Sequence, residues 1–430
     1  MLPENRGAGM IVTLPQRHGV DLTVAAPPSK SYTHRALIAA ALARGTSTIV
    51  HPLIADDTQL TMAALRRLGV PLEAGERSVT IEGCDGKLSC PPGTVLDLDN
   101  SGTSLRLLAS TALLCDHPVT FTGSARMQER PVGPLAGTLS DLGGMVVFAK
   151  KPGSPPLTIG GRLLGGSATI DGSASSQFAS SVLMAAPYAH HEVTLSITGT
   201  PASQSYLDIT TGVMTDFGAV IRREGYRQFA VSNQDHYTGH TYVIEGDYSS
   251  ASYFFALAAI CGGRVAVTGL NPDSVQGDRL FLEALRKMGC EVTYAHDGVM
   301  VEHEGPLSGI TIDMSSAPDT VQTLCMVAAV AKTPSLITGV GHLKYKESNR
   351  LTVTVERLRQ LGCVANTEGD RIVIQPAALH GGTIDPANDH RTAMSFAILG
   401  LGIGGVTITG AECVNKSFPG FWDAIKGVLE

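Results

Sequence analysis

The stretch that organises this chain is PPSKSYTHRALIAAALA, residues 27–43. Its second half is apolar on all faces and predicts a helix that begins just after the two prolines, because proline cannot continue a helix backwards. Ser29 is the expected N-cap. Lys30, Ser31 and Arg35 then fall in the first two turns, where free backbone N–H groups and the helix dipole attract anions. A capped surface helix with two solvated cations is the alternative interpretation.

Similar apolar helices recur along the chain, and each is followed by a β-branched run that ends in Thr-Gly. The glycines of these runs lie 70 to 76 residues apart, at positions 123, 199, 269, 339 and 410, and residues 46–51 form a degenerate first copy. A second pattern recurs in phase with the first, an amphipathic helix that ends in a glycine at positions 69, 143, 218, 289 and 362. A glycine just after a helix adopts positive φ at little cost. Together the two patterns predict six repeated βαβαββ-type units.

A helix that is apolar all round must be buried on all sides, so helices inside and sheets outside are expected. The chain ends in a helix with no following strand, while residues 10–14 form a strand without a unit of its own, so the N-terminal strand is expected to complete the last unit. The expected fold is α/β, with two similar domains, each an inside-out α/β barrel of three units, joined by a two-strand hinge. Domain I comprises residues 1–21 plus 246–430, and domain II comprises residues 22–245. One continuous solenoid of six units is the alternative, although nothing resembles polar terminal caps.

Composition limits the classes of partner. The chain has 430 residues, 43% of them hydrophobic, which fits two domains, and its net charge of −7 argues against nucleic acid or an anionic membrane as a partner. Eight scattered cysteines without a Cys-x-x-Cys pair indicate a reduced cytoplasmic protein, with neither a zinc site nor a disulfide framework. No apolar run reaches the length of a membrane span, and nothing requires a metal or an organic cofactor.

Candidate site residues in the first half of the chain lie at helix starts. Gly102, in Asn-Ser-Gly-Thr, leaves backbone N–H groups open to a ligand, and Arg130 precedes a proline in an extended position. The run Ser175, Ser176 and Gln177, with the later Ser203, offers uncharged hydrogen-bonding groups suited to phosphate or sugar-like hydroxyls. Each of these patterns taken alone also fits simple helix capping or a surface ion pair.

The second half contributes charge. Asp319 lies where a buried helix is expected to start, and it is either an N-cap or a catalytic carboxylate. The run at residues 344–350 places three cations and one carboxylate at a helix start, where cations oppose the helix dipole unless an anion is bound. Asp-His-Arg, ending at Arg391, again combines an acid and a cation, in the sixth unit. Lys416 follows the last predicted strand.

From residue 10 onward the chain resembles the 5-enolpyruvylshikimate-3-phosphate synthase family, the shikimate-pathway enolpyruvyl transferases. Its short motifs occur in the family's order: Ser-Lys-Ser with the later Arg, Asn-x-Gly-Thr, Glu-Arg-Pro, Ser-Ser-Gln-Phe, Gly-Asp-x-Ser-Ser-Ala, Lys-Glu-Ser-x-Arg, Asp-His-Arg and a final Lys. The resemblance implies an inside-out α/β barrel in each domain. It also implies that phosphoenolpyruvate and shikimate 3-phosphate bind in an interdomain cleft that closes around them.

The resemblance carries roles onto matching residues. Those expected to bind shikimate 3-phosphate are Lys30, Ser31, Arg35, Ser175, Ser176, Gln177, Ser203, Asp319 and Lys346. Those expected to meet phosphoenolpyruvate are Lys30, Gly102, Arg130, Gln177, Arg350, Arg391 and Lys416. Proton transfer calls for two carboxylates. We expect Asp319 to act as the base toward the substrate hydroxyl and Glu347 as the proton donor, with Lys30 as a further participant. The expected protein is a monomer.

Some residues depart from the better-known bacterial pattern. Ser-Leu-Arg-Leu follows Thr103 where many relatives have Ala-Met-Arg-Pro, which leaves the sensitivity to the inhibitor glyphosate open. Asn349 replaces a frequent Asp, and His342 stands where many relatives have an Asn that contacts the shikimate phosphate. Two alternative functions remain: the related cell-wall transferase that acts on UDP-N-acetylglucosamine, and a non-catalytic phosphometabolite-binding protein. The first usually has a Lys-Asn pair where this chain has Lys30-Ser31. The second would lose the two acids.

Overall fold

A computed structural model describes residues 9–429 of the chain. Its internal contacts divide the chain into two compact units, with boundaries between Pro27 and Pro28 and between Glu245 and Gly246. We call the unit that contains both ends of the chain unit 1 and the unit of residues 28–245 unit 2. The first boundary lies at Pro27 rather than at residue 21.

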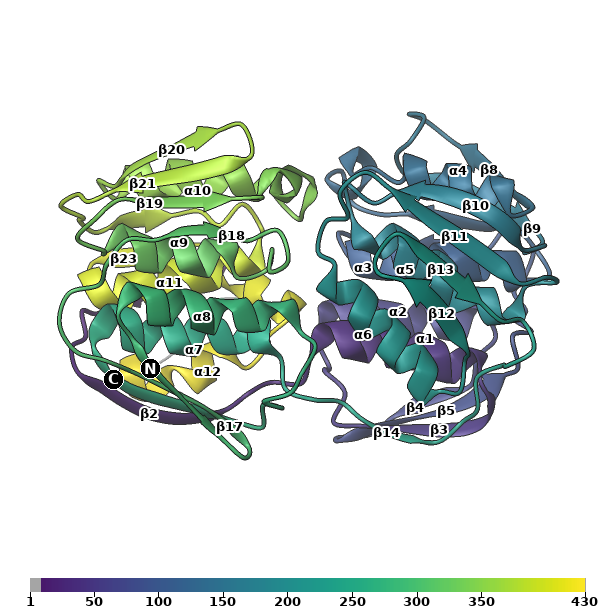
Figure 1. The fold of residues 1–430 in the computed structure, drawn as a ribbon, viewed down its shortest axis with the longest axis horizontal. Helices are drawn as coiled ribbons and strands as arrows, with labels where there is room; N and C mark the ends of the chain where they lie inside the picture. The colour runs from purple at the N-terminus through teal and green to yellow at the C-terminus, as the bar shows by residue number, and fades with distance from the viewer. Residues whose placement is uncertain (1–8, 430) are drawn as a thin grey trace. The chain divides into compact units, whose positions relative to one another are not determined.

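Unit 2 has three inner helices, three outer helices, three short 3-10 segments and three four-stranded sheets (Figure 1). The inner helices are α1 (Lys30–Leu42), α3 (Gly102–Ala109) and α5 (Ser176–Ala185), and the outer ones are α2 (Asp56–Arg67), α4 (Gly133–Asp141) and α6 (Ser205–Asp216). The 3-10 segments are η1 (Ser110–Leu114), η2 (Met127–Glu129) and η3 (Ala186–Tyr188). In spatial order the sheets are β14 (Thr241–Val243), β3 (Arg44–Val50), β5 (Ser78–Cys84), β4 (Leu72–Ala74); β6 (Val95–Asp97), β7 (Val119–Thr122), β9 (Leu157–Gly161), β8 (Gly144–Phe148); and β10 (Gly166–Asp171), β11 (Val193–Thr198), β13 (Gln228–Val231), β12 (Ile221–Glu224).

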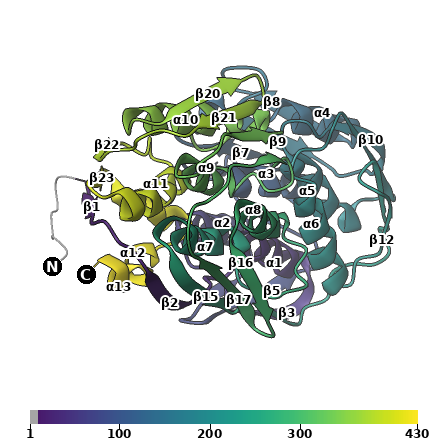
Figure 2. The ribbon, with the colours of Figure 1, turned by 60° about the vertical axis from the view of Figure 1, so that its left-hand side comes forward.

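Unit 1 repeats this plan, and its inner helices lie between the sheets in two views (Figure 1, Figure 2). The inner helices are α7 (Tyr248–Cys261), α9 (Val321–Ala329) and α11 (His390–Ile403), and the others are α8 (Leu280–Met288), α10 (Arg350–Gln360), α12 (Phe421–Ala424) and α13 (Lys426–Leu429). The 3-10 segments are η4 (Gly277–Arg279), η5 (Gly341–Tyr345) and η6 (Ala411–Lys416). In spatial order the sheets are β16 (Glu291–Ala295), β17 (Gly298–His303), β15 (Gly263–Thr268), β2 (Val20–Ala25); β18 (Thr311–Asp313), β19 (Ser335–Thr338), β21 (Arg371–Gln375), β20 (Val364–Glu368); and β1 (Val12–Leu14), β23 (Val406–Ile408), β22 (Gly382–Ile384).

The inner helices are buried on every side, as their composition predicts. Every residue from Ala36 to Ala43 is fully buried, and α7, α9 and α11 are nearly so along their length. The outer helices are amphipathic and end as expected, with positive φ at glycines such as Gly69 (84°) and Gly362 (88°). The predicted α/β fold, with helices inside and sheets outside in each unit, is thereby confirmed.

The chain changes units in a way that the repeats alone do not reveal. β2 precedes α1 in sequence, yet it pairs in parallel with β15 of unit 1, and β14 precedes α7 yet pairs in parallel with β3 of unit 2. Each connecting strand therefore belongs to the unit that the chain is leaving. Residue 22 lies inside β2, which is why the boundary falls at Pro27.

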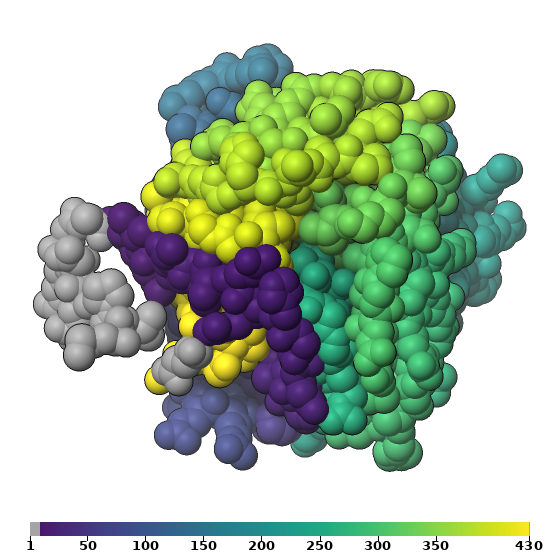
Figure 3. All heavy atoms as spheres, turned by 90° about the vertical axis from the view of Figure 1, so that its left-hand side faces the viewer, coloured from purple at the N-terminus to yellow at the C-terminus, as the bar shows by residue number. Residues whose placement is uncertain are grey.

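The N-terminal strand lies beside the C-terminal part of the chain. β1 pairs antiparallel with β23, so that Val12 faces Ile408 and Leu14 faces Val406. Figure 3 shows this segment in purple against the yellow C-terminal segments. β1 supplies the position that a β-hairpin strand occupies in the other sheets. Among residues 9–429 this last sheet has three strands, whereas the others have four.

Candidate functional site

The first turns of the helices bring the candidate residues of unit 2 together. Lys30 is the first residue of α1, Asp57 the second of α2, and Gly102 the first of α3. Hydrogen bonds link these turns to each other and to the start of α5. The site of unit 2 is therefore built where several helix N-termini, with their free N–H groups, lie close together.

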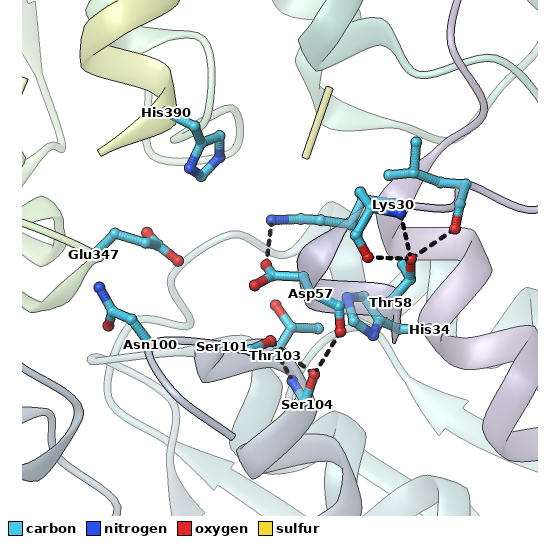
Figure 4. A network of polar contacts seen from close by, with 12 residues as sticks. Lys30, His34, Asp57, Thr58, Asn100, Ser101, Thr103, Ser104, Glu347 and His390 are labelled. Carbon is cyan, nitrogen blue, oxygen red and sulfur yellow. Dashed lines mark hydrogen bonds and ion pairs between the residues drawn. The ribbon is translucent and has the colours of Figure 1, made fainter. Parts of the chain in front are cut away.

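Lys30 forms a buried ion pair that motif analysis missed. Its Nζ lies 3.1 Å from Oδ2 of Asp57, and the two residues are 8% and 1% exposed (Figure 4). The backbone carbonyl of Asp57 accepts a hydrogen bond of 3.1 Å from the Ser104 hydroxyl, which connects α2 to α3. Asp57 thus fixes the position of the Lys30 ammonium group and offsets the cost of burying it.

Arg35 lies deeper than a surface cation would. Its guanidinium is buried and donates to the hydroxyls of Thr210 (2.7 Å) and Ser180 (3.4 Å) and to the carbonyls of Ser31 (3.0 Å) and Tyr206 (3.3 Å). Burial lowers the pKa of Arg35 to about 10. The alternative of two solvated cations at this helix start is therefore wrong, since both Lys30 and Arg35 are buried.

Arg130 lies directly over Gly102. A Cβ atom added to Gly102 would come within 2.4 Å of Nη2 and 2.5 Å of Cζ of Arg130. Nη1 of Arg130 donates to the carbonyl oxygen (3.0 Å) and to Oδ1 (3.3 Å) of Asn100. The guanidinium therefore occupies space that only glycine leaves free at the start of α3, next to the Ser101 N-cap.

Gln177 joins α5 to α3. Its Nε2 donates to Thr103 Oγ1 at 3.0 Å, while its Oε1 accepts from Arg106 Nη1 at 2.9 Å. Ser175 caps α5 by accepting from the Gln177 backbone N–H. Arg106 fixes which way the Gln177 amide faces, a role that its place in the motif did not suggest.

Ser203 and Ser176 occupy less ordinary positions. Ser203 is buried with φ of 59°, a conformation that a non-glycine residue adopts at a cost and that often marks a functional site. The segment before it is tied to the loop before α5, since Ala202 N–H donates to the carbonyl of Gly172 at 3.0 Å. Ser176, the first residue of α5, is buried.

Arg350 is the centre of the charged cluster in unit 1. Its guanidinium contacts three carboxylates: Asp389 (Nε to Oδ2, 2.8 Å; Nη2 to Oδ1, 3.2 Å), Glu347 (Nη2 to Oε2, 2.8 Å) and Asp319 (Nη1 to Oδ1, 3.0 Å). Burial opposes the charge, but these three acids raise the pKa of Arg350 above its ordinary value. Asp319 does not cap α9, whose N-cap is Thr320, so of its two interpretations the capping role is wrong.

Asp389 is the first residue of the Asp-His-Arg motif, and the motif gave it no role of its own. It caps α11 by accepting from the Arg391 N–H at 3.0 Å, and it accepts from the Ser348 hydroxyl at 2.9 Å. Burial opposes its charge, yet the attraction of Arg350 lowers the pKa of Asp389. This carboxylate fixes Arg350 in place through two hydrogen bonds.

Arg391 completes the cluster. Its Nη2 lies 2.9 Å from Oδ2 of Asp319 and 3.0 Å from the Ser249 hydroxyl, and its Nη1 lies 3.3 Å from the Tyr253 hydroxyl. Asp319 therefore lies between two arginines, with one carboxylate oxygen toward each. A small anion with carboxylate or phosphate oxygens would find two planar guanidinium groups here.

Two further predicted residues lie on short segments of unit 1. Lys346 follows η5 and Lys416 ends η6, and both are half-buried. His342 is on η5; burial, with Lys346 nearby, lowers its pKa to about 3, so the imidazole is neutral at physiological pH. In unit 1 the structure thus brings Asp319, Glu347, Arg350 and Arg391 into direct contact.

Within residues 9–429, no group of three or more His, Cys, Asp and Glu side chains is arranged to hold a metal ion. All eight cysteines are free thiols. None of the helices in this part of the chain is both long enough and apolar enough to cross a membrane.

Comparison with known proteins identifies the family. The family model for EPSP synthase (3-phosphoshikimate 1-carboxyvinyltransferase) matches residues 15–425. A 3-phosphoshikimate 1-carboxyvinyltransferase from Methanoregula boonei is 76% identical over 98% of this chain and 100% of the relative, and one from Methanoculleus marisnigri is 59% identical over 97% of this chain and 99% of the relative. The solved structure of EPSP synthase from Acinetobacter baumannii superposes with a TM-score of 0.80 at 28% identity, over 97% of this chain and 98% of that one. The chain belongs to the EPSP synthase family.

Proposed function

We propose that this protein transfers the enolpyruvyl group of phosphoenolpyruvate to the 5-hydroxyl of shikimate 3-phosphate and releases phosphate. The observation that carries the proposal is the position of Asp319 between Arg350 and Arg391. Glu347 also contacts Arg350. This arrangement supplies both anion-binding groups and carboxylates for proton transfer in one place. A non-catalytic binding protein has no need of the two acids.

The reaction adds the hydroxyl across the double bond of phosphoenolpyruvate. The hydroxyl oxygen bonds to C2, its proton leaves to a base, and the methylene carbon takes a proton and becomes a methyl group. From this tetrahedral intermediate phosphate leaves, while a methyl proton is withdrawn and the double bond forms again. Two groups that exchange protons are therefore needed, one near the hydroxyl and one near the methylene carbon.

We assign the base to Asp319 and the proton donor to Glu347. In the structure Asp319 is paired with the guanidinium groups of Arg350 and Arg391. An anionic substrate that binds these two arginines would replace Asp319 as their partner, and the carboxylate oxygens of Asp319 could then accept the proton of the substrate hydroxyl. Glu347 lies 2.8 Å from Arg350 Nη2, a pairing that favours its ionised form, so its donor role depends on the charge that the bound substrates bring. Lys30, paired with Asp57, is the further participant from unit 2.

We assign the binding roles by charge and by polar groups. Shikimate 3-phosphate would be held by Lys30, Ser31, Arg35, Ser175, Ser176, Gln177, Ser203, Asp319 and Lys346. Phosphoenolpyruvate would meet Lys30, Gly102, Arg130, Gln177, Arg350, Arg391 and Lys416. Arg35 already donates to two hydroxyls and two carbonyls. We therefore expect it to act mainly by fixing Ser31 and the start of α6 around the ligand.

The proposal further includes a cytoplasmic monomer whose two domains close on shikimate 3-phosphate. The product test is ³¹P and ¹H nuclear magnetic resonance of a mixture of the protein with both substrates. A new phosphate signal together with vinyl protons of an enol ether is expected. Unchanged spectra at high protein concentration would contradict the proposed reaction.

A further inference from the structure

The nitrogen of Arg391 that contacts Asp319, Nη2, also contacts a hydroxyl of the neighbouring inner helix. Ser249 lies in the first turn of α7, and its Oγ is 3.0 Å from Nη2 of Arg391. Tyr253, one turn further along α7, places its hydroxyl 3.3 Å from Nη1. Arg391 and Ser249 are 3% and 4% exposed, so water is largely excluded from this contact.

The direction of the Ser249 hydroxyl is set by a carboxylate behind it. Ser249 Oγ lies 2.5 Å from Oδ1 of Asp247, and since an ionised carboxylate only accepts, the serine proton points to Asp247. The lone pairs of Oγ then face the Arg391 N–H. Asp247 is itself held, because its Oδ1 accepts from the Ser250 backbone N–H at 3.0 Å as the N-cap of α7.

From this chain of contacts we propose that Ser249, oriented by Asp247, is a positioning residue for Arg391 in the transferase reaction. The inference rests on the proposed function, in which Arg391 binds phosphoenolpyruvate. Asp319 must give up its contact with Arg391 to accept a proton from the substrate hydroxyl. Ser249 takes no part in the proton transfer and keeps the guanidinium in place through that step.

The test is a set of variants at Ser249, read as separate KM values for the two substrates. In Ser249→Ala the acceptor is lost, and we expect KM for phosphoenolpyruvate to rise about tenfold or more, as expected for one hydrogen bond to a charged donor. KM for shikimate 3-phosphate and kcat should change much less. Ser249→Thr, which keeps the hydroxyl, should restore KM relative to the isosteric Ser249→Val.

Ser252→Ala is the matched control. Ser252 is a buried serine of the same helix, and its hydroxyl bonds to the Ser249 carbonyl (2.6 Å) and to Thr323 (3.3 Å) but not to Arg391. If the hydroxyls on α7 had a purely structural role, Ser252→Ala would raise KM for phosphoenolpyruvate as much as Ser249→Ala does. The inference predicts that KM for phosphoenolpyruvate stays near the value of the unaltered protein.

A double-mutant cycle with Arg391→Lys decides whether Ser249 acts through the arginine. Lysine cannot reproduce the contacts that the planar guanidinium makes. In the Arg391→Lys protein, Ser249→Ala should therefore raise KM for phosphoenolpyruvate little further. If the two substitutions raise KM for phosphoenolpyruvate by factors that multiply in the double variant, the inference is overturned. An unchanged KM for phosphoenolpyruvate in a folded Ser249→Ala protein would overturn it as well. If that variant does not fold, Asp247→Asn gives the same test, with a smaller shift of the same kind expected. Inactivity of the unaltered protein with both substrates would refute the proposed function instead.

Discussion

Substituting Gly102 with alanine tests the contact between α3 and Arg130. The added methyl carbon would lie 2.4 Å from Nη2 and 2.5 Å from Cζ of Arg130, whereas non-bonded heavy atoms prefer separations of about 3.5 Å. The guanidinium must therefore withdraw by about 1 Å. It would then lose its hydrogen bonds to Asn100, which are 3.0 and 3.3 Å long.

The expected size of the effect follows from those bonds. A hydrogen bond to a charged group contributes about 1.5–3 kcal/mol, and about 1.4 kcal/mol corresponds to a factor of ten. We expect KM for phosphoenolpyruvate to rise roughly tenfold to a hundredfold in Gly102→Ala, with a smaller change in kcat. The assay is initial-rate phosphate release at saturating shikimate 3-phosphate.

Gly137→Ala is the control for replacing a helical glycine. Gly137 lies inside α4, and nothing lies within 4 Å of the position that its Cβ would take. This variant should keep its KM values and gain about 0.5–1 kcal/mol of stability, because alanine loses less backbone freedom than glycine. A folded Gly102→Ala protein with an unchanged KM for phosphoenolpyruvate would refute the role given to Arg130.

Three further changes test other parts of the site. Glu347→Gln should cut kcat far more than it changes either KM, and unchanged turnover would exclude Glu347 as the proton donor. Asp57→Asn removes the charged partner of Lys30, 3.1 Å away, and should lower the free energy of unfolding measured by urea titration by about 3–5 kcal/mol. Asp56→Asn, at the exposed neighbouring position, should leave that free energy nearly unchanged. The pKa of His342 is lowered from 6.5 to about 3, so the unfolded chain takes up a proton that the folded one does not as the pH falls through this range. Stability should therefore drop from pH 6.5 toward 3, and His342→Asn should flatten that slope in urea titrations; an identical slope would assign the pH dependence to other groups.

The inner helices illustrate what the sequence makes predictable. Residues 36–43 have no polar face, so burial on all sides follows directly, and the glycines after the outer helices have the positive φ that their position predicts. In the sequence Lys30 is picked out because it lies at a helix start that attracts anions, and Arg350 because cations at a helix start oppose the dipole unless an anion compensates. For both residues that charge is already balanced inside the protein, by Asp57 and by three acids respectively.

Other features depend on contacts between segments far apart in the chain. Asp57 lies 27 residues after Lys30, and in sequence it is one of two ordinary acids in the first turn of α2. Ser249 faces Arg391 across 142 residues, a pairing that no local spacing encodes. The pairing of β2 with unit 1 is equally hidden, because β2 is a short strand directly before the first helix of unit 2. The sequence patterns therefore reveal which residues carry charge but not which partner holds each one.

The most direct test of the central claim is phosphate release from phosphoenolpyruvate by the purified protein, with shikimate 3-phosphate, with UDP-N-acetylglucosamine, and with neither. We predict release that depends on shikimate 3-phosphate and is lost in Asp319→Asn. Release only with the nucleotide sugar would contradict the substrate assignment, and release with neither would contradict catalysis itself and leave a protein that binds phosphometabolites.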